Sequence, residues 1–550
     1  MLRIHRHFVL SLAALTLAAS PGKAETPAEV RAAESAFTAF FDAADAVSYI
    51  DSGYVNRVEG RDLAGWRKTA AERQRALGAA LSTAGRGPLS KSDAFAIAAM
   101  RKSLDAFEPD EFSSNDAASA APATTCKDAR RRDLDYAAIR ASLVQCYVEI
   151  GNQLKFENGT VDRGTALQLL HVIEEPGRRK VLFDAFLPLW AALNGNDEPD
   201  SPYRRMIAMA AADATHGGSE IDTAARAIGV DTAQVERWLV QILEEWRDVS
   251  GPSMVEPWDY RYQGSAANRL LASRIPAAAL LPANNRFYRD LGADPEKLGV
   301  LFDLAPRAGK SPLAYTDFLH RGRSAGTQWQ PPVARVVGMY PTGGLFSLNE
   351  LVHETGHAVH VSAIHTRPAY RDWPDSLFAE AFADVPSWST YEPAWQRRYL
   401  GADVPEAMAL RALFSDVMLD VSWSLFELRM LRDPKVDPNV IWTDITSSYL
   451  HVVPHPEVPW WAMRVQLVDS PGYMVNYGLG AVLTAEMRER TVKAIGPFDA
   501  GNGQWYEWQS RHLLQFGSER DTLTLLQALL GRPISPDALL RQVHRSQAPR

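Results

Sequence analysis

Residues 347–384 run SLNELVHETGHAVHVSAIHTRPAYRDWPDSLFAEAFAD, and they carry the most informative pattern in the chain. Ser347 and Glu350 lie three residues apart, as in a capping box, where each side chain binds a free backbone N–H at a helix start. Apolar residues then recur at helical spacing, namely Leu348, Leu351, Val352, Val359 and Ala363. We therefore predict an amphipathic helix that begins at Ser347.

Two histidines on this predicted helix are spaced for binding one metal ion. His353 and His357 lie one helical turn apart, so both imidazoles project from the same face. Glu354 follows the first histidine, where its carboxylate can reach a water on the metal and act as general base. A structural zinc site takes four protein ligands and a catalytic one takes three, so we predict a third ligand downstream and an open position for water.

The sequence FAEAFADVPSW offers that third ligand. Glu380 lies beyond His357, and Asp384 lies one turn after Glu380 on the same face if the segment is helical. We predict that Glu380 binds the zinc ion and that Asp384 accepts the distal N–H of one zinc histidine, which orients its ring. The alternative is a buried amphipathic helix whose histidines only pair with carboxylates.

The composition is that of an ordinary globular protein. Of 550 residues, 46% are hydrophobic and 23% are charged, and the formal net charge is −8. The negative charge argues against nucleic acid and anionic membranes as partners. Beyond the N-terminal region, no stretch reaches the ~18 uninterrupted apolar residues typical of a membrane-spanning helix.

Residues 1–24 have the pattern of a secretory signal peptide. Arg3 and Arg6 are followed by an apolar run from Phe8 to Ala19 and by the small residues around Ala24. The run is too short to cross a bilayer, so we predict export to the periplasm or the medium without stable membrane insertion after cleavage. The alternative is an N-terminal helix that is not cleaved.

The predicted export determines the oxidation state expected for the two cysteines. Cys126 and Cys146 are the only pair in the chain, and an oxidising compartment favours a disulfide between them. Both lie far from the HETGH segment in sequence, and two thiolates do not complete a zinc site. We therefore predict a structural role.

The first half of the chain is predicted to be helical, with breaks at turn-forming clusters. One apolar stripe consists of Val30, Phe37, Phe40, Phe41 and Ala44, and another of Ala94, Ala98, Met100, Leu104 and Phe107. Residues 113–125 are rich in Ser, Ala and Pro, which is typical of a connection between packed regions.

Short strands are predicted just before the HETGH helix. Residues 302–310 have the pattern of a strand that runs into a turn, and residues 335–340 have the β-branched content of another. A strand beside a catalytic helix can hold an extended peptide by edge pairing, although a purely structural sheet explains the pattern equally well. Residues 404–432 are again predicted to be helical.

Candidates for stabilising an oxyanion follow later in the chain. Hydrolysis of an amide develops negative charge on oxygen, and a phenol or an imidazole directed at it lowers the barrier. Tyr473 and Tyr477 are one turn apart, and His451 and His455 are the possible imidazole donors.

Four segments in this order resemble the thimet oligopeptidase and oligoendopeptidase family of zinc metallopeptidases. They are EPWDYRY (256–262), FDLAPRAGK (302–310), HETGHAVH (353–360) and GYMVNYG (472–478). FAEAFADV is more similar to angiotensin-converting enzyme, a related zinc peptidase. The resemblance implies a mainly α ellipsoid with a deep substrate channel and a small β-sheet beside the zinc helix. It also implies that residues 25–250 form one channel wall and that residues 251–550 form the catalytic region.

This sequence departs from the family pattern at two points. FADVPSW can also be aligned so that Asp384, rather than Glu380, binds zinc; we favour Glu380 for its longer side chain. The family has a histidine shortly before its tyrosines, where this chain has Gln466, Val468 and Asp469, so His455 is retained as a candidate from a longer loop.

The sequence as a whole predicts an exported zinc-dependent oligopeptidase that takes one Zn²⁺ per chain and cleaves short peptides. The first alternative is a peptidyl dipeptidase of the angiotensin-converting-enzyme type, which needs a cation for the substrate carboxylate. Arg307, Lys310 and Arg464 are the candidates for that cation, and the sequence does not rank them. The second alternative is a catalytically silent zinc- or peptide-binding protein, against which the presence of Glu354 argues. Oligomeric state is not predicted.

Overall fold

The computed structural model describes residues 26–547, apart from 52, 54, 108–111, 113–123, 306, 308–309, 311–313, 326–327 and the side chains of 214–217. The predicted signal peptide (1–24) and most of the predicted connection at 113–125 lie outside the described residues. The chain is mainly helical, as predicted, with a few short strands. No helix in the described ranges is both long enough and apolar enough to span a membrane.

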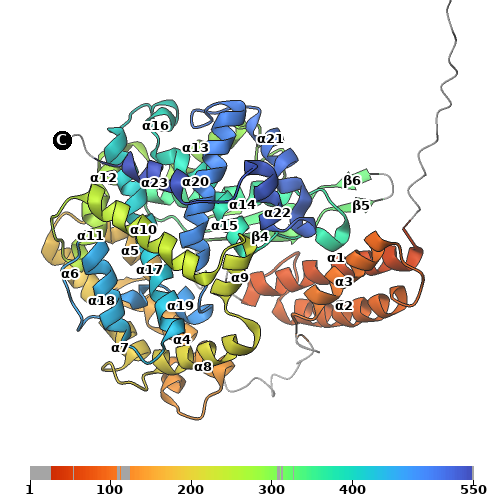
Figure 1. Cartoon of the computed structure of the whole chain (residues 1–550), viewed down its shortest axis with the longest axis horizontal. Coiled ribbons are helices and arrows are strands. Elements are labelled where there is room, and N and C mark those ends of the chain that lie inside the picture. The colour runs from red at the N-terminus through yellow and green to blue at the C-terminus, as the bar shows by residue number, and fades with distance from the viewer. Residues whose placement is uncertain are drawn as a thin grey trace, which may run out of the picture.

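Three helices form an N-terminal unit beside the main body (Figure 1): α1 (Ala28–Asp51), α2 (Leu63–Ala84) and α3 (Lys91–Leu104). The predicted stripe on α1 is buried, and Phe37, Phe40 and Phe41 form the centre of a small separate core. That core also takes in Leu319 and Val337, which belong to the sheet described below. The unit is therefore attached to the body through strands that lie next to the helix of residues 345–363.

Helices α4 to α13 build much of the body. They are α4 (Tyr136–Glu149), α5 (Arg163–Leu170), α6 (Pro176–Asp184), α7 (Leu187–Asn194), α8 (Pro202–Gly217), α9 (Glu220–Ala227), α10 (Thr232–Ser250), α11 (Pro257–Gly264), α12 (Ala266–Leu271) and α13 (Leu280–Asp290), with a hairpin of β1 (Leu154–Phe156) and β2 (Gly159–Val161) after α4. Their buried side chains share one large core with the rest of the chain up to Val543. The core is therefore divided between α3 and α4, and it continues unbroken across the expected boundary at residue 250.

The disulfide predicted between Cys126 and Cys146 is confirmed. Cys146 lies on α4, and Cys126 lies in the segment that leads to it, with both side chains in the large core. The bond ties the start of this body to its first helix.

A three-stranded sheet lies against the helix that carries the HETGH segment, α14 (Leu345–Ala363), as predicted. Its order is β3 (Leu301–Asp303), β7 (Val333–Val337), β4 (Tyr315–His320), with β3 parallel and β4 antiparallel to the central β7. A separate hairpin consists of β5 (Arg323–Ala325) and β6 (Gln328–Gln330). The two strands expected from sequence correspond to β3 and β7, whereas β4, which forms one edge of the sheet, was not expected.

The remaining helices complete the body around the site: α14 (Leu345–Ala363), α15 (Ser376–Ser387), α16 (Pro393–Leu400), α17 (Glu406–Arg432), α18 (Pro438–Tyr449), α19 (Gln466–Asp469), α20 (Val475–Ile495), α21 (Trp505–His512), α22 (Thr522–Leu530) and α23 (Asp537–His544). α15 packs between α14 and α20, and α20 packs in turn on α17. Because of these contacts, residues of α14 and of α20, which are more than 100 positions apart in the chain, lie close to the same site.

The start of α14 differs from the prediction. The helix begins at Leu345, two residues before Ser347, and the preceding Gly344 has a φ of 106°. Glycine adopts this conformation readily, so the chain can enter the helix there without a side-chain cap. The predicted capping box is therefore wrong: Ser347 is buried in the first turn, and Glu350 lies farther along the helix.

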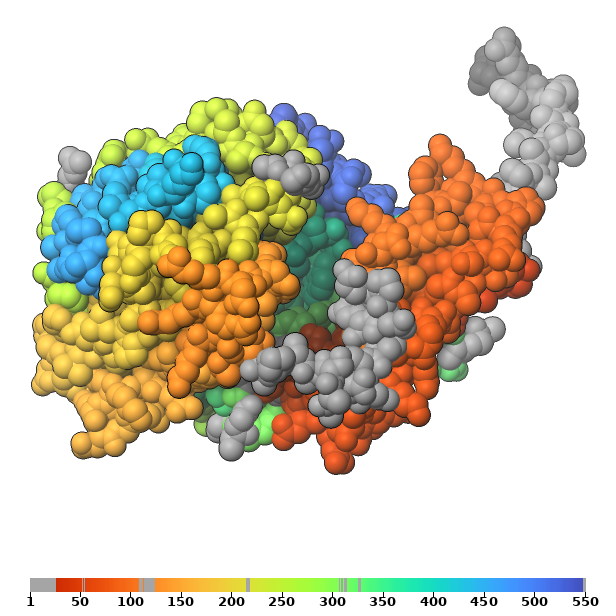
Figure 2. Space-filling view, turned by 90° about the horizontal axis from the view of Figure 1, so that it is seen from below, coloured from red at the N-terminus to blue at the C-terminus, as the bar shows by residue number. Residues whose placement is uncertain are grey.

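The molecule is hollowed between the N-terminal unit and the body. Figure 2 shows the hollow between the red-orange surface of α1–α3 and the orange to yellow surface that begins at α4, with green to teal segments at its floor. A cavity of about 600 Å³ lies above α14 and α15, and it is lined by Ser48 of α1 and by β4. Among residues 25–250, Ser48 is the described residue that lines this cavity, and the division expected at residue 250 remains a prediction.

Candidate metal centre and active site

The floor of the cavity is built by the close approach of α14 and α15. Gly356 stands between His353 and His357, and a Cβ at this position would lie 2.9 Å from the Cα and the carbonyl oxygen of Ala383 on α15. The absence of a side chain lets the two backbones pack closely. The glycine of HETGH therefore allows α15 to bring Glu380 against the two histidines.

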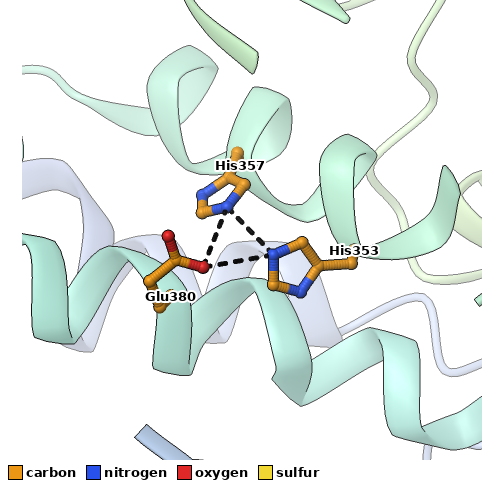
Figure 3. Close-up of side chains that lie close together, drawn as sticks. All are labelled: His353, His357 and Glu380. Atoms are coloured by element: carbon orange, nitrogen blue, oxygen red, sulfur yellow. Dashed lines mark hydrogen bonds and ion pairs between the residues drawn. The ribbon is translucent and has the colours of Figure 1, made fainter. Parts of the chain in front are cut away.

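Three side chains converge in the geometry of a metal site (Figure 3). The Nε2 atoms of His353 and His357 are 3.2 Å apart, and Oε2 of Glu380 lies 3.4 Å from the first and 3.8 Å from the second. Zinc–nitrogen bonds of about 2.0–2.1 Å in a tetrahedral arrangement place ligand atoms about 3.3 Å apart. These three residues are the group within the described ranges whose ligand atoms could hold a metal ion.

Asp384 lies behind this triangle rather than in it. Nδ1 of His353 is 2.7 Å from Oδ1 of Asp384, which also accepts a hydrogen bond of 3.0 Å from the Ser387 hydroxyl. With its proton on Nδ1, His353 presents the lone pair of Nε2 to the metal position. The contact expected between Asp384 and a metal-site histidine is present.

The charges of the two histidines differ because their surroundings differ. Burial lowers the pKa of His357 to about 4, which keeps its imidazole neutral and able to bind a metal. Burial acts the same way on His353, but the carboxylates of Asp384 and Glu380 outweigh it and raise that pKa well above its usual value. The acids thus favour a positive charge at this position, and a metal ion supplies one.

Glu354 faces the cavity beside the ligands. It is 7% exposed, and its Oε2 is buried without a hydrogen-bond partner among the described residues. Burial raises the pKa of this carboxyl to about 7. A buried carboxylate with a free oxygen and a pKa near neutrality is suited to accept a proton from water.

The two candidate tyrosines line the same cavity but have different partners. The Tyr473 hydroxyl donates a hydrogen bond of 2.9 Å to Oε1 of Glu380, the oxygen that does not face the histidines. The Tyr477 hydroxyl has the Gln466 side chain as its hydrogen-bonding neighbour, and its ring packs on the Arg464 guanidinium, 5.5 Å away. Tyr473 therefore contacts the candidate ligand Glu380, whereas the partner of Tyr477 lies outside the group of candidate ligands.

A buried acid on a distant helix holds the turn that carries Tyr473. The two carboxylate oxygens of Glu427, on α17, accept hydrogen bonds of 2.8 Å each from the backbone N–H groups of Gly472 and Met474. The Glu427 side chain is fully buried. Sequence reasoning missed this residue because it lies inside an apolar helical pattern with no motif around it.

His455 does not line the cavity, contrary to the prediction. Its ring nitrogens lie 2.7 Å from Glu457 and 2.9 Å from Glu256, and its ring packs on Trp258. His451 faces the backbone oxygen of Arg247 instead. A bridge between Val255 and Val452 pairs this loop with the segment before α11, which directs both histidines away from the metal position.

The chain was compared with known proteins. No protein-family model matches it, and no curated protein matches its sequence. Solved structures share its fold: PZ peptidase A is 14% identical with a TM-score of 0.60, over 95% of this chain and 97% of that one. Trypanosoma cruzi metallocarboxypeptidase 1 is 14% identical with a TM-score of 0.56, over 94% and 99%. A candidate oligoendopeptidase F from Bacillus anthracis is 16% identical with a TM-score of 0.52, over 92% and 94%.

These similarities extend over nearly the whole length of both chains in each comparison. At 14–16% identity they establish the fold. The mainly α peptidase architecture expected from the resemblance to oligoendopeptidases is thereby confirmed. The local resemblance to angiotensin-converting enzyme remains a prediction.

Proposed function

We propose that the protein is a zinc-dependent metallopeptidase that cleaves short peptides. The observation that carries this proposal is the triangle of His353, His357 and Glu380 on the floor of a cavity, with Glu354, whose Oε2 has no hydrogen-bond partner among the described residues, beside it. Two imidazoles and one carboxylate are the ligand set of many catalytic zinc sites, which keep a position open for water. The fold shared with solved peptidase structures supports the same conclusion.

The residues present fit a zinc ion and have separate tasks around it. Zinc bound by these ligands polarises the scissile carbonyl and makes water acidic enough to react near neutral pH. Glu354 accepts the proton of the attacking water and later delivers it to the leaving amine. Asp384 holds the tautomer of His353, and Tyr473 holds Glu380.

Tyr477 is the group best placed to stabilise the oxyanion. Its hydroxyl has the neutral Gln466 side chain as its partner, whereas the hydroxyl of Tyr473 is bound to the carboxylate of Glu380. A donor that is not held by a carboxylate can redirect its hydrogen bond as negative charge develops on the substrate oxygen. The sequence left oxyanion stabilisation to either tyrosine; we therefore assign it to Tyr477 and assign the support of Glu380 to Tyr473.

The β4 edge of the sheet suggests how a peptide is held. β4 pairs with β7 on one side, and Tyr315, Thr316 and Asp317 of β4 line the cavity; the backbone N–H and C=O of Asp317 already bind the Tyr49 hydroxyl of α1. An extended peptide can bind such an edge through backbone hydrogen bonds, with little dependence on side chains. The strand proposed from sequence for this task, β7, is the central strand, so its edges are already occupied.

A carboxypeptidase or peptidyl dipeptidase is the second candidate, and one observation favours it. Lys310 and Arg307 both bind Asp303, and neither lines the main cavity. Arg464 does line it; one of its terminal nitrogens binds Asp420, while its buried Nε has no partner among the described residues. The remaining N–H groups of this arginine could bind the C-terminal carboxylate of a substrate.

The test is the incubation of a mixed peptide library with the mature protein, followed by mass spectrometry of the products. Wild type is compared with Glu354→Gln and His357→Ala, each with and without a chelator. We expect cleavage by wild type only, zinc retained in Glu354→Gln, and zinc lost in His357→Ala. Internal cuts identify an oligopeptidase, and removal of C-terminal residues alone identifies the second candidate. Turnover by Glu354→Gln would contradict its assignment as the base.

We also propose export, which is supported by the signal-like pattern of residues 1–24 and by the disulfide. N-terminal sequencing of the protein recovered from the producing cells tests this. We expect a mature chain that begins near Glu25, and recovery of an intact Met1 from the cytoplasm would contradict export.

A further inference from the structure

One acid on the cavity wall has no task in the proposed mechanism. Glu350 precedes Glu354 by one turn and His357 by two turns, so all three project from the same face of α14. It lines the cavity of about 600 Å³ together with Glu354. It also lines a smaller cavity of about 210 Å³ that continues past His353 toward Arg464 and Asp420.

Glu350 differs from its acidic neighbours in having no partner. No hydrogen bond or ion pair of its carboxylate is found among the described residues, whereas Glu380 and Asp384 contact His353, and Asp420 binds Arg464. The side chain is half-buried, so a carboxylate there gives up part of its hydration. Glu350 thus lacks the direct contact that the neighbouring acids have, and the charges of His353, Arg464 and Arg163 act on it only through space.

The nearby cations are already engaged by other groups. Arg464 is bound to Asp420, and its guanidinium packs on the rings of Trp423 and Tyr477 at 5.1 and 5.5 Å. Arg261 binds Asp416 at 2.8 Å, and Arg163 donates to the backbone oxygen of Met463. A cation in direct contact with Glu350 is therefore expected to enter the cavity with the substrate.

We propose that Glu350 binds a cationic nitrogen of the peptide substrate and makes the enzyme selective for positively charged peptides. The inference rests on the proposed function, which it deepens by naming the substrate class. The cation is either a lysine or arginine side chain or the α-ammonium group of the peptide. A half-buried carboxylate that meets such a group favours the charged substrate over a neutral one of the same shape.

The experiment compares peptides that differ only in charge. A fluorogenic peptide is made with lysine or with the isosteric, neutral norleucine at each position flanking the cleaved bond, and each is made with a free or an acetylated N-terminus. The ratio of kcat/KM between charged and neutral partners is measured for wild type, Glu350→Gln and Asp469→Asn. Asp469 is an exposed acid that lines the same cavity, so this variant controls for the general negative field. Because each ratio is internal to one variant, a general loss of activity cancels.

We expect wild type to favour one charged partner by about tenfold or more, which corresponds to about 1.4 kcal/mol. In Glu350→Gln the ratio should fall to within about twofold of unity, while Asp469→Asn retains most of it. Dependence on lysine or on the free N-terminus identifies the source of the cation. No preference in wild type, a preference that survives Glu350→Gln, or an equal loss in Asp469→Asn would overturn the proposal.

Failure of the proposed function is distinguished by a binding measurement. If the zinc-loaded protein hydrolyses none of these peptides, the proposed function fails, and the same pairs are titrated calorimetrically against wild type and Glu350→Gln. Tighter binding of the charged partner to wild type alone would support the role of Glu350. Equal affinities would overturn it.

Discussion

The floor and the facing wall of the cavity are built in different ways. The floor takes its ligands from two consecutive helices, α14 and α15, which touch at Gly356. The wall takes Tyr473 from the turn before α20, Tyr477 from the first turn of α20, Arg464 from a loop, and an edge strand from before α14. A single helix pair therefore brings the candidate metal ligands together, whereas the wall depends on contacts between segments far apart in the chain.

The largest effect on kcat/KM among the wall residues is expected at Tyr477. Tyr477→Phe should lower kcat/KM by about 10²–10³-fold without changing zinc affinity, because it removes a donor to the oxyanion. Tyr473→Phe should lower kcat/KM by about tenfold and weaken zinc binding, because it removes the hydrogen bond that holds Glu380. Steady-state kinetics and zinc competition with a chelator measure both. The reverse pattern would exchange the two roles.

Substitutions in the floor test which of Glu380 and Asp384 binds the zinc ion and which supports His353. Asp384→Ala should weaken zinc affinity by about 10–100-fold through the loss of the partner of His353, with binding still measurable. Glu380→Ala removes one of three ligands and should abolish tight binding. Titration with a competing chelator gives both affinities. Complete loss in Asp384→Ala with retention in Glu380→Ala would make Asp384 the ligand.

A smaller effect on kcat/KM is expected from Glu427, which supports the turn that carries Tyr473. Glu427→Gln places an amide N–H₂ against one of the backbone donors at Gly472 and Met474, so the turn that carries Tyr473 is displaced. We expect kcat/KM to fall by about tenfold, and by much less when Tyr473→Phe is already present.

The matched control for this substitution is Glu486→Gln. Glu486 is equally buried, but it binds Arg532 and lies away from the turn. Its loss should lower stability while kcat/KM is retained. Equal losses of kcat/KM in both variants would show that Glu427 acts only through stability.

The last prediction concerns His360, which lies beneath the floor, and it appears only in how the stability of the fold depends on pH. His360 is fully buried among Trp373, Phe378 and Phe382, and burial lowers its pKa to about 3. Below the unfolded pKa of about 6.5, the unfolded chain binds a proton that the folded chain does not. Stability is therefore lost as the pH falls from about 6.5 toward 3, by about 2 kcal/mol at pH 5.

Replacement of His360 by leucine should remove this dependence. Denaturant midpoints at pH 7.5 and pH 5 are compared for wild type, His360→Leu and the exposed-site control His512→Asn. We expect His360→Leu to lose less stability on acidification than the other two proteins do. An equal loss in all three would show that His360 does not titrate on unfolding.

Local pattern was sufficient for the floor of the site. The spacing of His353, Glu354 and His357 defines one face of a helix, and a carboxylate ligand was expected on the next helix. A helical period and a ligand set are properties of short segments, so they can be inferred from the order of residues. The mainly α fold followed from the same periodicity and from the resemblance to oligoendopeptidases.

Only the tertiary structure determined the rest. Glu350 had the spacing of a helix cap, yet the helix starts earlier and the residue lines the cavity. His455 had the chemistry of an oxyanion donor, yet its loop is paired with a segment elsewhere. Glu427 had no recognisable pattern, yet it holds the turn before α20. The direction in which a polar side chain points is set by packing between distant segments, and that packing leaves little trace in the residues around each position.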